Sequence, residues 1–179
     1  MAGQYTYDYP RPMLTADVIL LRVTDGALEA LLIKRGRAPE EGRWAFPGGF
    51  MDVNERLANT ATRELAEETG IADVILEPFG VFDAPKRDPR GRVITVGHIG
   101  LLCGEEVDAR AGDDAADAGW FTISDMPALA FDHEEMLQTA LEWLAARLGV
   151  STEEPDCFLA LSPEEQAAVR GCLAEVVES

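Results

Sequence analysis

Residues 47–71 hold two adjacent glycines, a stretch free of glycine and proline, and one further glycine. Gly48 and Gly49 allow the backbone to bend tightly and to approach a ligand closely. The stretch 50–69 is rich in Ala, Leu, Glu and Arg, which favour a helix. Gly70 can adopt the left-handed conformation that ends a helix. We therefore expect a glycine loop, then a helix, then a stop. A capping-box-like pair, Asp52 and Glu55, predicts a helix start beside residue 52.

Three glutamates share one side of the predicted helix. Glu64, Glu67 and Glu68 are spaced i, i+3 and i+4, so they lie within an arc of about 100°. Like charges at this spacing destabilise a helix by roughly a few tenths of a kcal/mol per pair, and Arg63 can offset part of this. A divalent cation would offset more, because carboxylates together with substrate phosphates are ligands that Mg²⁺ prefers. A solvated helix face is the alternative interpretation.

Composition narrows the class of protein. The chain has 179 residues with 47% apolar content, which fits one globular domain. Its net charge of −18 would repel nucleic acid, and no apolar stretch approaches the ~20 residues of a membrane span. Three scattered cysteines, Cys103, Cys157 and Cys172, favour a reducing compartment. The N-terminal residues lack a secretory signal pattern. We therefore expect a cytoplasmic protein that binds neither nucleic acid nor membranes.

The apolar pattern predicts strands on both sides of the glycine-flanked helix. A turn signal at Asp25-Gly26 joins the first two strands into a hairpin. The predicted strands are 14–24, 28–34, 44–46, 74–84, 93–103 and 119–122. Further helices are predicted at 133–148, with Asp132 as N-cap, and at 163–177, with Val169, Leu173 and Val176 on one side. This order predicts an α+β fold, an α/β/α sandwich around a mixed β-sheet.

The chain divides into three predicted parts. Residues 1–13 form an N-terminal arm with alternating tyrosines, which is either a strand of its own domain or an arm that pairs with a second subunit. Residues 14–148 form the main domain. Residues 149–179 form a C-terminal helical extension of the same domain.

A basic loop interrupts this acidic sequence. Residues 85–92 include four cationic side chains, and their prolines and glycine exclude a helix. A cationic loop near an acidic, metal-binding helix suits a substrate with two phosphates. A solvated hairpin tip is the alternative.

The spacing of the whole segment resembles the signature box of the Nudix hydrolases. The matching positions are Gly49-x5-Glu55-x7-Arg63-Glu64-Leu65-x-Glu67-Glu68-x-Gly70-Ile71. The flanking stretches 7–12, 14–17, 82–92, 111–115 and 130–133 are similar to those of the bacterial ADP-ribose pyrophosphatase group. Pro85, fifteen residues beyond Gly70, lies about where such enzymes carry a characteristic proline. The resemblance implies the Nudix fold and Mg²⁺-dependent hydrolysis, with Mn²⁺ as a substitute, of ADP-ribose to AMP and ribose 5-phosphate.

The resemblance also implies residue roles. Glu64, Glu67 and Glu68 would bind the metal with the Gly48 carbonyl, and Arg63 would hold these catalytic glutamates in place. Either Glu64 or a later acidic residue would act as general base; the later candidates are Glu105, Glu106, Asp113 and Asp114. Arg35, Arg87 and Arg90 are candidates for binding phosphate, since Arg binds it bidentately. Phe46 or Phe82 would stack the adenine.

Two alternatives stay open at this point. One is another Nudix substrate: a nucleoside triphosphate, a dinucleotide or a sugar nucleotide. The other is a non-catalytic sensor of ADP-ribose. Regulators of that kind carry a DNA-binding winged helix, and we expect none here because only about 30 residues, with a net acidic composition, follow the predicted Nudix unit. A homodimer is expected from the resemblance.

Overall fold

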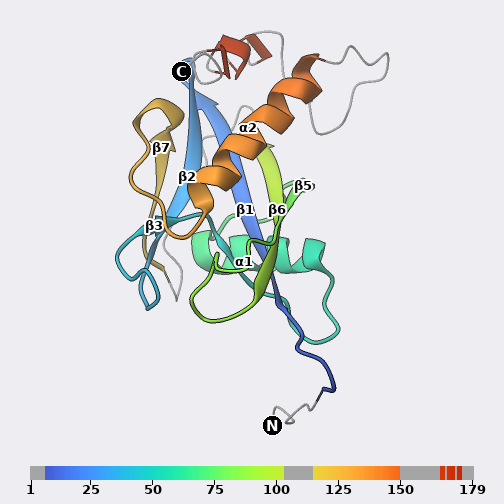
Figure 1. The fold of residues 1–179 in the computed structure, drawn as a ribbon. Coiled ribbons are helices and arrows are strands. Elements are labelled where there is room, and N and C mark those ends of the chain that lie inside the picture. Colours follow the sequence, from blue (N-terminus) through green and yellow to red (C-terminus); the bar gives the residue numbers. More distant parts are fainter. Residues whose placement is uncertain (1–6, 103–114, 150–165, 168, 172, 175–179) are drawn as a thin grey trace.

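The structure is a computed structural model that describes residues 7–102, 115–149, 166–167, 169–171 and 173–174. Figure 1 shows the arrangement of the elements. The strands are β1 Met13–Thr24, β2 Ala27–Arg35, β3 Trp44–Ala45, β4 Gly48–Phe50, β5 Glu77–Phe82, β6 Val93–Leu102 and β7 Ala115–Thr122. The α-helices are α1 Leu57–Thr69 and α2 His133–Gly149, and a short 3-10 helix spans Ile123–Asp125. The described residues between 166 and 174 are also helical.

Strand β1 is the centre of the sheet. Its length pairs in parallel with β6, while its first part pairs antiparallel with β4 and its last part pairs antiparallel with β2. The strand order is β3-β2-β1-β6-β5, and β7 pairs with β2. The hairpin between β1 and β2 turns at Asp25 and Gly26, whose φ angles of 51° and 80° suit a two-residue turn. The mixed sheet and this predicted hairpin are confirmed.

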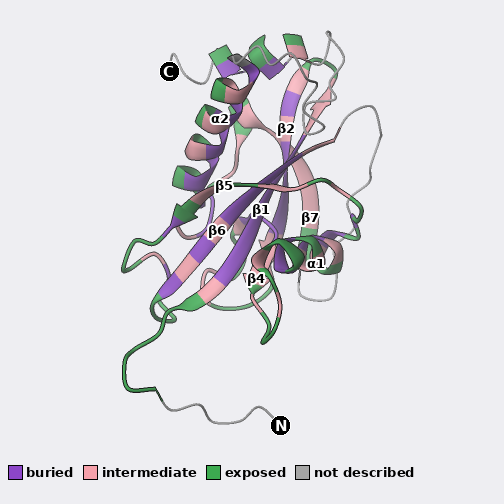
Figure 2. Cartoon of the chain, turned by 90° about the vertical axis from the view of Figure 1, so that its right-hand side faces the viewer, coloured by how far each residue is buried: buried purple, intermediate pink, exposed green. Residues whose placement is uncertain are grey.

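The two helices cover opposite faces of the sheet, as Figure 2 shows. Successive residues of a strand point to opposite faces, and β1 is buried on both. Val18 and Leu20 pack with Leu65 of α1. Ile19 and Leu21 belong to the larger core that α2 completes. The α+β sandwich predicted from the sequence is confirmed.

The start of α1 differs from the prediction. The helix begins at Leu57, and its N-cap Arg56 is extended and makes no side-chain cap. Asp52 N–H does donate to the Glu55 carboxylate, at 3.1 Å, but this bond closes a local turn rather than a helix. Asn54, with φ 75°, interrupts the helical backbone. The predicted stop is confirmed, because Gly70 has φ 74° and donates to Ala66 O at 2.9 Å.

Two strand boundaries also differ. β5 begins at Glu77 rather than at residue 74. β7 already begins at Ala115 rather than at residue 119, because this segment pairs with β2 as far as Arg35. Such a partner is distant in sequence, so local composition does not reveal it. Helix α2 begins at His133, as predicted.

The ends of the chain are described in part. Residues 7–12 are exposed and extend away from the sheet (Figures 1 and 2), and Tyr9 is 81% exposed. Val169 and Leu173 are buried in the same core as α2. Tyr5, Val176 and the three cysteines lie outside the described residues. The division into arm, main domain and extension stays a prediction. Within the described part of the chain, no helix has the length and apolarity needed to cross a membrane.

Candidate active site

The glycine strand β4 lies between the start of β1 and helix α1. Gly48 N–H donates to Glu68 Oε2 at 2.9 Å. A Cβ at Gly49 would overlap the Glu64 carboxylate, and one at Gly48 would overlap Asp17 and Ala16 O. Both glycines have ordinary strand pairing with β1. Glycine is therefore required here for close approach to α1 and β1, rather than for a turn.

A cleft of about 400 Å³ opens beside this contact. It is lined by Glu64, Glu68, Arg63 and the two glycines, and also by Arg35 and Arg90. The remaining lining residues are Ile33, Gly36, Arg37, Ala38, Phe50 and Asp52. The cleft thus combines acidic and basic side chains in one space, which suits a phosphate-bearing ligand with an associated cation.

Burial makes two of the glutamates unusually easy to protonate. Burial raises the pKa of Glu68 to about 7; the hydrogen bond from Gly48 opposes the rise, and the negative charges of Glu64 and Asp17 add to it. Burial also raises the pKa of Glu64, against the effect of Arg63. Shifted carboxylates in a cleft are typical of functional sites.

Arg63 organises the acidic residues around it. Its Nε and Nη2 donate to the Glu55 carboxylate at 3.0 Å each, and its Nη1 donates to Glu64 at 2.6 Å and Glu67 at 3.1 Å. It also donates to Phe50 O at 3.1 Å. The bonds from Arg63 hold the pKa of Glu55 at about 2. The predicted positioning role of Arg63 therefore fits its contacts, and Glu55 orients Arg63.

Glu67 differs from the other two glutamates. Its side chain is 60% exposed, its described contact is with Arg63, and it does not line the cleft. Glu67 shares the helical arc with Glu64 and Glu68, but it does not share their cleft. The reason is that this arc extends from the cleft to the solvent. Its assignment as a metal ligand stays a prediction.

The donor set fits Mg²⁺ in part. Among the described residues, no group of three or more His, Cys, Asp or Glu side chains is arranged to hold a metal ion. However, Mg²⁺ is usually bound through one or two carboxylates together with substrate phosphates and water. Glu64 and Glu68 supply two carboxylates in one cleft. A cation would also offset the burial that raises both pKa values, so these two residues fit such a site.

Two of the predicted phosphate-binding residues line the cleft. Arg35 lies over the Phe131 ring at 4.8 Å, and Arg90 lies over the rings of Phe50 at 4.7 Å and Phe131 at 5.8 Å. Arg90 also pairs with Asp88 at 2.6 Å. Burial, with Arg90 close by, lowers the pKa of Arg35, whereas the charge of Glu68 opposes this. Both arginines line the same cleft as Glu64 and Glu68.

The phosphate role of Arg87 stays a prediction, because its guanidinium is held in an ion pair while the residue also lines a pocket with Arg35 and Arg90. Its side chain is 4% exposed, and its Nε and Nη2 donate to Asp132 at 2.7 and 2.6 Å. Asp17 lies 4.0 Å away. The guanidinium is thus committed to a buried ion pair. Asp132, predicted as a helix cap, is the partner in this pair.

The aromatic residues predicted to stack adenine are also core residues. Phe46 is 2% exposed and stacks on His133, with ring centroids 5.4 Å apart. Phe82 is 8% exposed and packs edge-on against Phe79. Phe46 also lines a neighbouring pocket together with Arg35 and Arg90, whereas Phe82 does not line the cleft. The adenine-stacking role of the two rings stays a prediction. Periodicity does not distinguish a core aromatic from a ligand-stacking one.

Several residues at the site were missed in the sequence. Asp17 is buried in β1, where it accepts a 2.6 Å hydrogen bond from Thr95. His133 accepts a 3.0 Å bond from Phe46 N–H through Nδ1. Phe131 is left-handed, with φ 54°. A charged residue inside the apolar stretch 16–21 was the available signal for Asp17. The general-base candidates Glu105, Glu106, Asp113 and Asp114 lie outside the described residues.

Comparisons with known proteins agree with this geometry. The family model described as the NUDIX domain matches residues 12–143. The chain is 41% identical over 123 residues to the ADP-ribose pyrophosphatase of Methanocaldococcus jannaschii, covering 66% of this chain and 72% of that protein. It is 35% identical over 160 residues to the ADPR responsive transcriptional repressor NtrR of Acinetobacter baylyi, covering 87% of this chain and 62% of the repressor.

A solved structure shows the same fold. The NUDIX domain of Shewanella oneidensis NrtR, cocrystallised with ADP ribose, has a TM-score of 0.70 and 33% identity, and covers 77% of this chain and 94% of that domain. The family match, these relatives and the acidic cleft built on the signature box lead to one conclusion. The chain belongs to the Nudix hydrolase family.

Proposed function

We propose that the protein hydrolyses ADP-ribose to AMP and ribose 5-phosphate. The observation that carries the proposal is that one cleft is lined by two carboxylates, Glu64 and Glu68, and by two guanidiniums, Arg35 and Arg90. A diphosphate bound in this cleft would contact both arginines, and its oxygens would lie close to the two carboxylates. The similarity to an ADP-ribose pyrophosphatase and to an ADP ribose-bound domain supports this choice of substrate.

The two arginines and the two glutamates have separate roles in this reaction. Arg35 and Arg90 bind the diphosphate and orient it. Glu64 and Glu68 would hold Mg²⁺, or Mn²⁺ in its place, which supplies Lewis-acid polarisation of the phosphate and activation of water. Arg63 holds the Glu64 carboxylate, and Gly48 N–H holds that of Glu68. Water adds to one phosphorus, the bond from that phosphorus to the bridging oxygen breaks, and each product keeps one phosphate.

If Glu64 takes the proton from water instead of binding the metal, it is the candidate base among the described residues. Its carboxylate lines the cleft, and burial raises its pKa. A base is most effective when its pKa approaches the working pH. The acidic residues predicted at 105–106 and 113–114 are the competing assignment.

The test is incubation of the purified protein with ADP-ribose and Mg²⁺, followed by chromatography of the nucleotides. AMP should form, and EDTA should stop its formation. Intact ADP-ribose would reject this substrate, and a panel of nucleoside triphosphates, dinucleotides and sugar nucleotides would follow. AMP formation that persists in excess EDTA would reject the metal-dependent mechanism.

A sensor of ADP-ribose is the second candidate, because the chain is also similar to an ADPR responsive repressor. A sensor would bind ADP-ribose without cleaving it. A rise in melting temperature with ADP-ribose and Mg²⁺, without AMP, would favour this function over hydrolysis.

A further inference from the structure

The ring of one aromatic residue, Phe131, contacts both arginines of the cleft. The ring of Phe131 lies 4.8 Å from the guanidinium carbon of Arg35 and 5.8 Å from that of Arg90. Arg35 ends strand β2, whereas Arg90 belongs to the loop between β5 and β6. Contacts of this length between a guanidinium and an aromatic face are attractive. Phe131 is therefore the side chain that two separate segments share.

The backbone of Phe131 is itself unusual. Its φ of 54° lies in the left-handed region, which a bulky side chain rarely adopts. Such a conformation persists where the surrounding structure enforces it, and it often marks a functional site. The ring therefore contacts the arginines while the backbone of Phe131 is strained.

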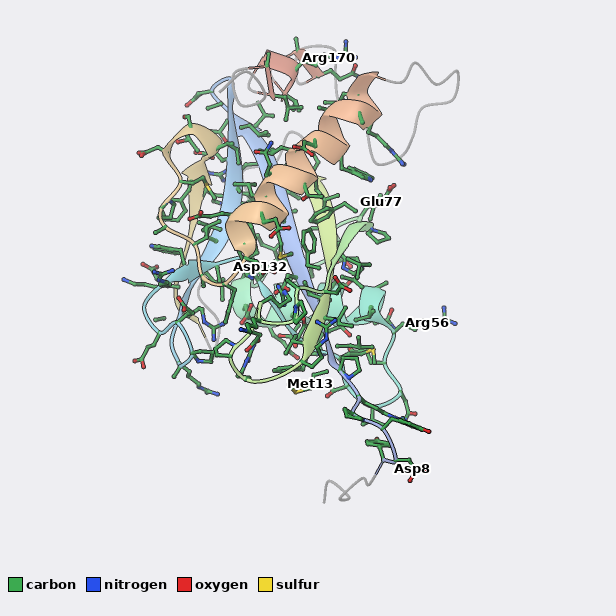
Figure 3. All side chains as sticks on the ribbon, in the orientation of Figure 1. Asp8, Met13, Arg56, Glu77, Asp132 and Arg170 are labelled. Atoms are coloured by element: carbon green, nitrogen blue, oxygen red, sulfur yellow. The ribbon has the colours of Figure 1, made fainter. Side chains whose placement is uncertain are left out.

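The neighbours of Phe131 supply that enforcement. Ala130 N–H donates to Trp44 O at 2.8 Å. Asp132 holds Arg87 of the β5–β6 loop through two hydrogen bonds, and Figure 3 labels Asp132 beside the first turn of α2. His133 accepts the Phe46 N–H just before the glycine strand. Residues 130–133 are thus attached to the β5–β6 loop and, through Trp44 and Phe46, to the segment that precedes β4.

The two arginines repel each other. The charge of Arg90 adds to burial in lowering the pKa of Arg35, so each guanidinium disfavours the charge of the other. The Phe131 ring is close to both guanidiniums and attracts both, and an anion in the cleft would neutralise both charges. Two neighbouring phosphate groups can each bind one arginine at the same time. A ligand that is otherwise identical but carries a single phosphate gains less from the second arginine.

We propose that Phe131 is a positioning residue that holds Arg35 and Arg90 together as a clamp for a diphosphate in preference to a monophosphate. The inference rests on the proposed function, since the clamped group would be the diphosphate that is cleaved. It goes further in assigning the preference to a residue that touches the arginines rather than the metal-binding glutamates.

The test compares two adenosine ligands by calorimetry in the presence of Mg²⁺: AMP and the non-hydrolysable α,β-methylene analogue of ADP. Wild type should bind the diphosphate analogue more tightly than AMP. Phe131→Leu should weaken binding of the analogue about tenfold and that of AMP less than about threefold. Phe131→Tyr keeps the ring and should retain the preference.

Trp143→Leu is the matched control, because it removes the ring that Arg147 covers at 5.0 Å on α2, away from the cleft. It should leave both affinities unchanged. If Phe131→Leu does not fold, Phe131→Gly removes the ring and relieves the left-handed backbone. Equal weakening of both ligands, no weakening of either, or a wild type without the preference would each overturn the clamp.

The outcomes separate this inference from the proposed function. A wild type that prefers the diphosphate analogue but leaves ADP-ribose intact would refute the hydrolysis and keep the clamp. Cleavage of ADP-ribose with a KM unaffected by Phe131→Leu would refute the clamp and keep the hydrolysis.

Discussion

Gly48 and Glu68, twenty residues apart in the chain, are joined by a 2.9 Å hydrogen bond from the glycine N–H to the carboxylate Oε2. The bond fixes one oxygen of a buried glutamate whose pKa burial raises to about 7. It therefore connects the glycine strand to the acidic helix at the point where the cleft opens. A substitution of Glu68 should therefore change activity and stability to different extents.

Glu68→Gln should remove most turnover and leave the fold intact. The amide oxygen can still accept from Gly48 N–H, but the ligand charge is gone, and kcat should fall about a hundredfold or more. The melting temperature should stay equal or rise, because an uncompensated buried charge has been removed. Glu67→Gln is the matched comparison on the same helix, and its loss should be smaller because Glu67 is 60% exposed. Equal losses would place Glu67 in the site.

Arg63→Lys should lower kcat by about 10- to 100-fold, as expected when a group that orients metal ligands is changed. Lysine is a single point charge and cannot contact Glu55, Glu64 and Glu67 with the fork of a guanidinium. Mg²⁺ affinity, measured by titrating activity, should fall in parallel. Arg56→Lys is the control, because Arg56 is exposed and projects outward in Figure 3. Unchanged kinetics in the lysine variant at position 63 would contradict the orienting role.

Arg87→Ala should destabilise the protein rather than weaken substrate binding selectively. Removing one partner of a buried ion pair typically costs about 3–5 kcal/mol, which corresponds to a fall of about 10 °C in Tm for a domain of this size. Thermal melts of Arg87→Met, Asp132→Leu and the double variant should show that the double change costs less than the sum of the single changes. A raised KM with an unchanged Tm would support the phosphate-binding role.

The buried histidines should make stability depend on pH. Burial is the main cause that lowers the pKa of His133; Arg87 and Arg35 add to the effect, whereas Asp17 and Asp132 oppose it. Below about pH 6.5 the unfolded chain binds more protons at this histidine than the folded one does. The folded state with a neutral His133 is therefore fully stable above that pH and loses stability as the pH falls. Burial lowers the pKa of His98 in the same direction.

The raised pKa values of Glu64 and Glu68 act in the opposite direction, so the histidine contribution is measured as a difference between variants. His133→Asn keeps an acceptor for Phe46 N–H, because the amide oxygen can occupy the position of Nδ1, but the side chain no longer titrates. Its Tm should fall less than that of wild type between about pH 8 and pH 5.5. An equal or larger fall in the variant would show that His133 does not supply this dependence.

The fold and the acidic side of the cleft could be predicted from the sequence, because their signals are local. Alternating or continuous apolar residues identified the main strands, and Gly70 identified the end of α1. The burial of Arg87, Phe46 and Phe82 could not be predicted. Their environments depend on Asp132, His133 and Phe79, which are brought close by the sheet and α2. The same holds for the start of β7, which depends on its partner β2.

The parallel pairing of β1 with β6 also has a consequence for synthesis of the protein. Thr15 and Thr95, eighty residues apart, are in direct contact across these strands. A nascent chain therefore carries the most buried strand without one of its neighbours until β6 has left the ribosome. Non-local pairing of this kind slows folding and leaves strand edges open to wrong partners. Chains that end between residues 71 and 93 should consequently aggregate, even though they contain the whole signature box.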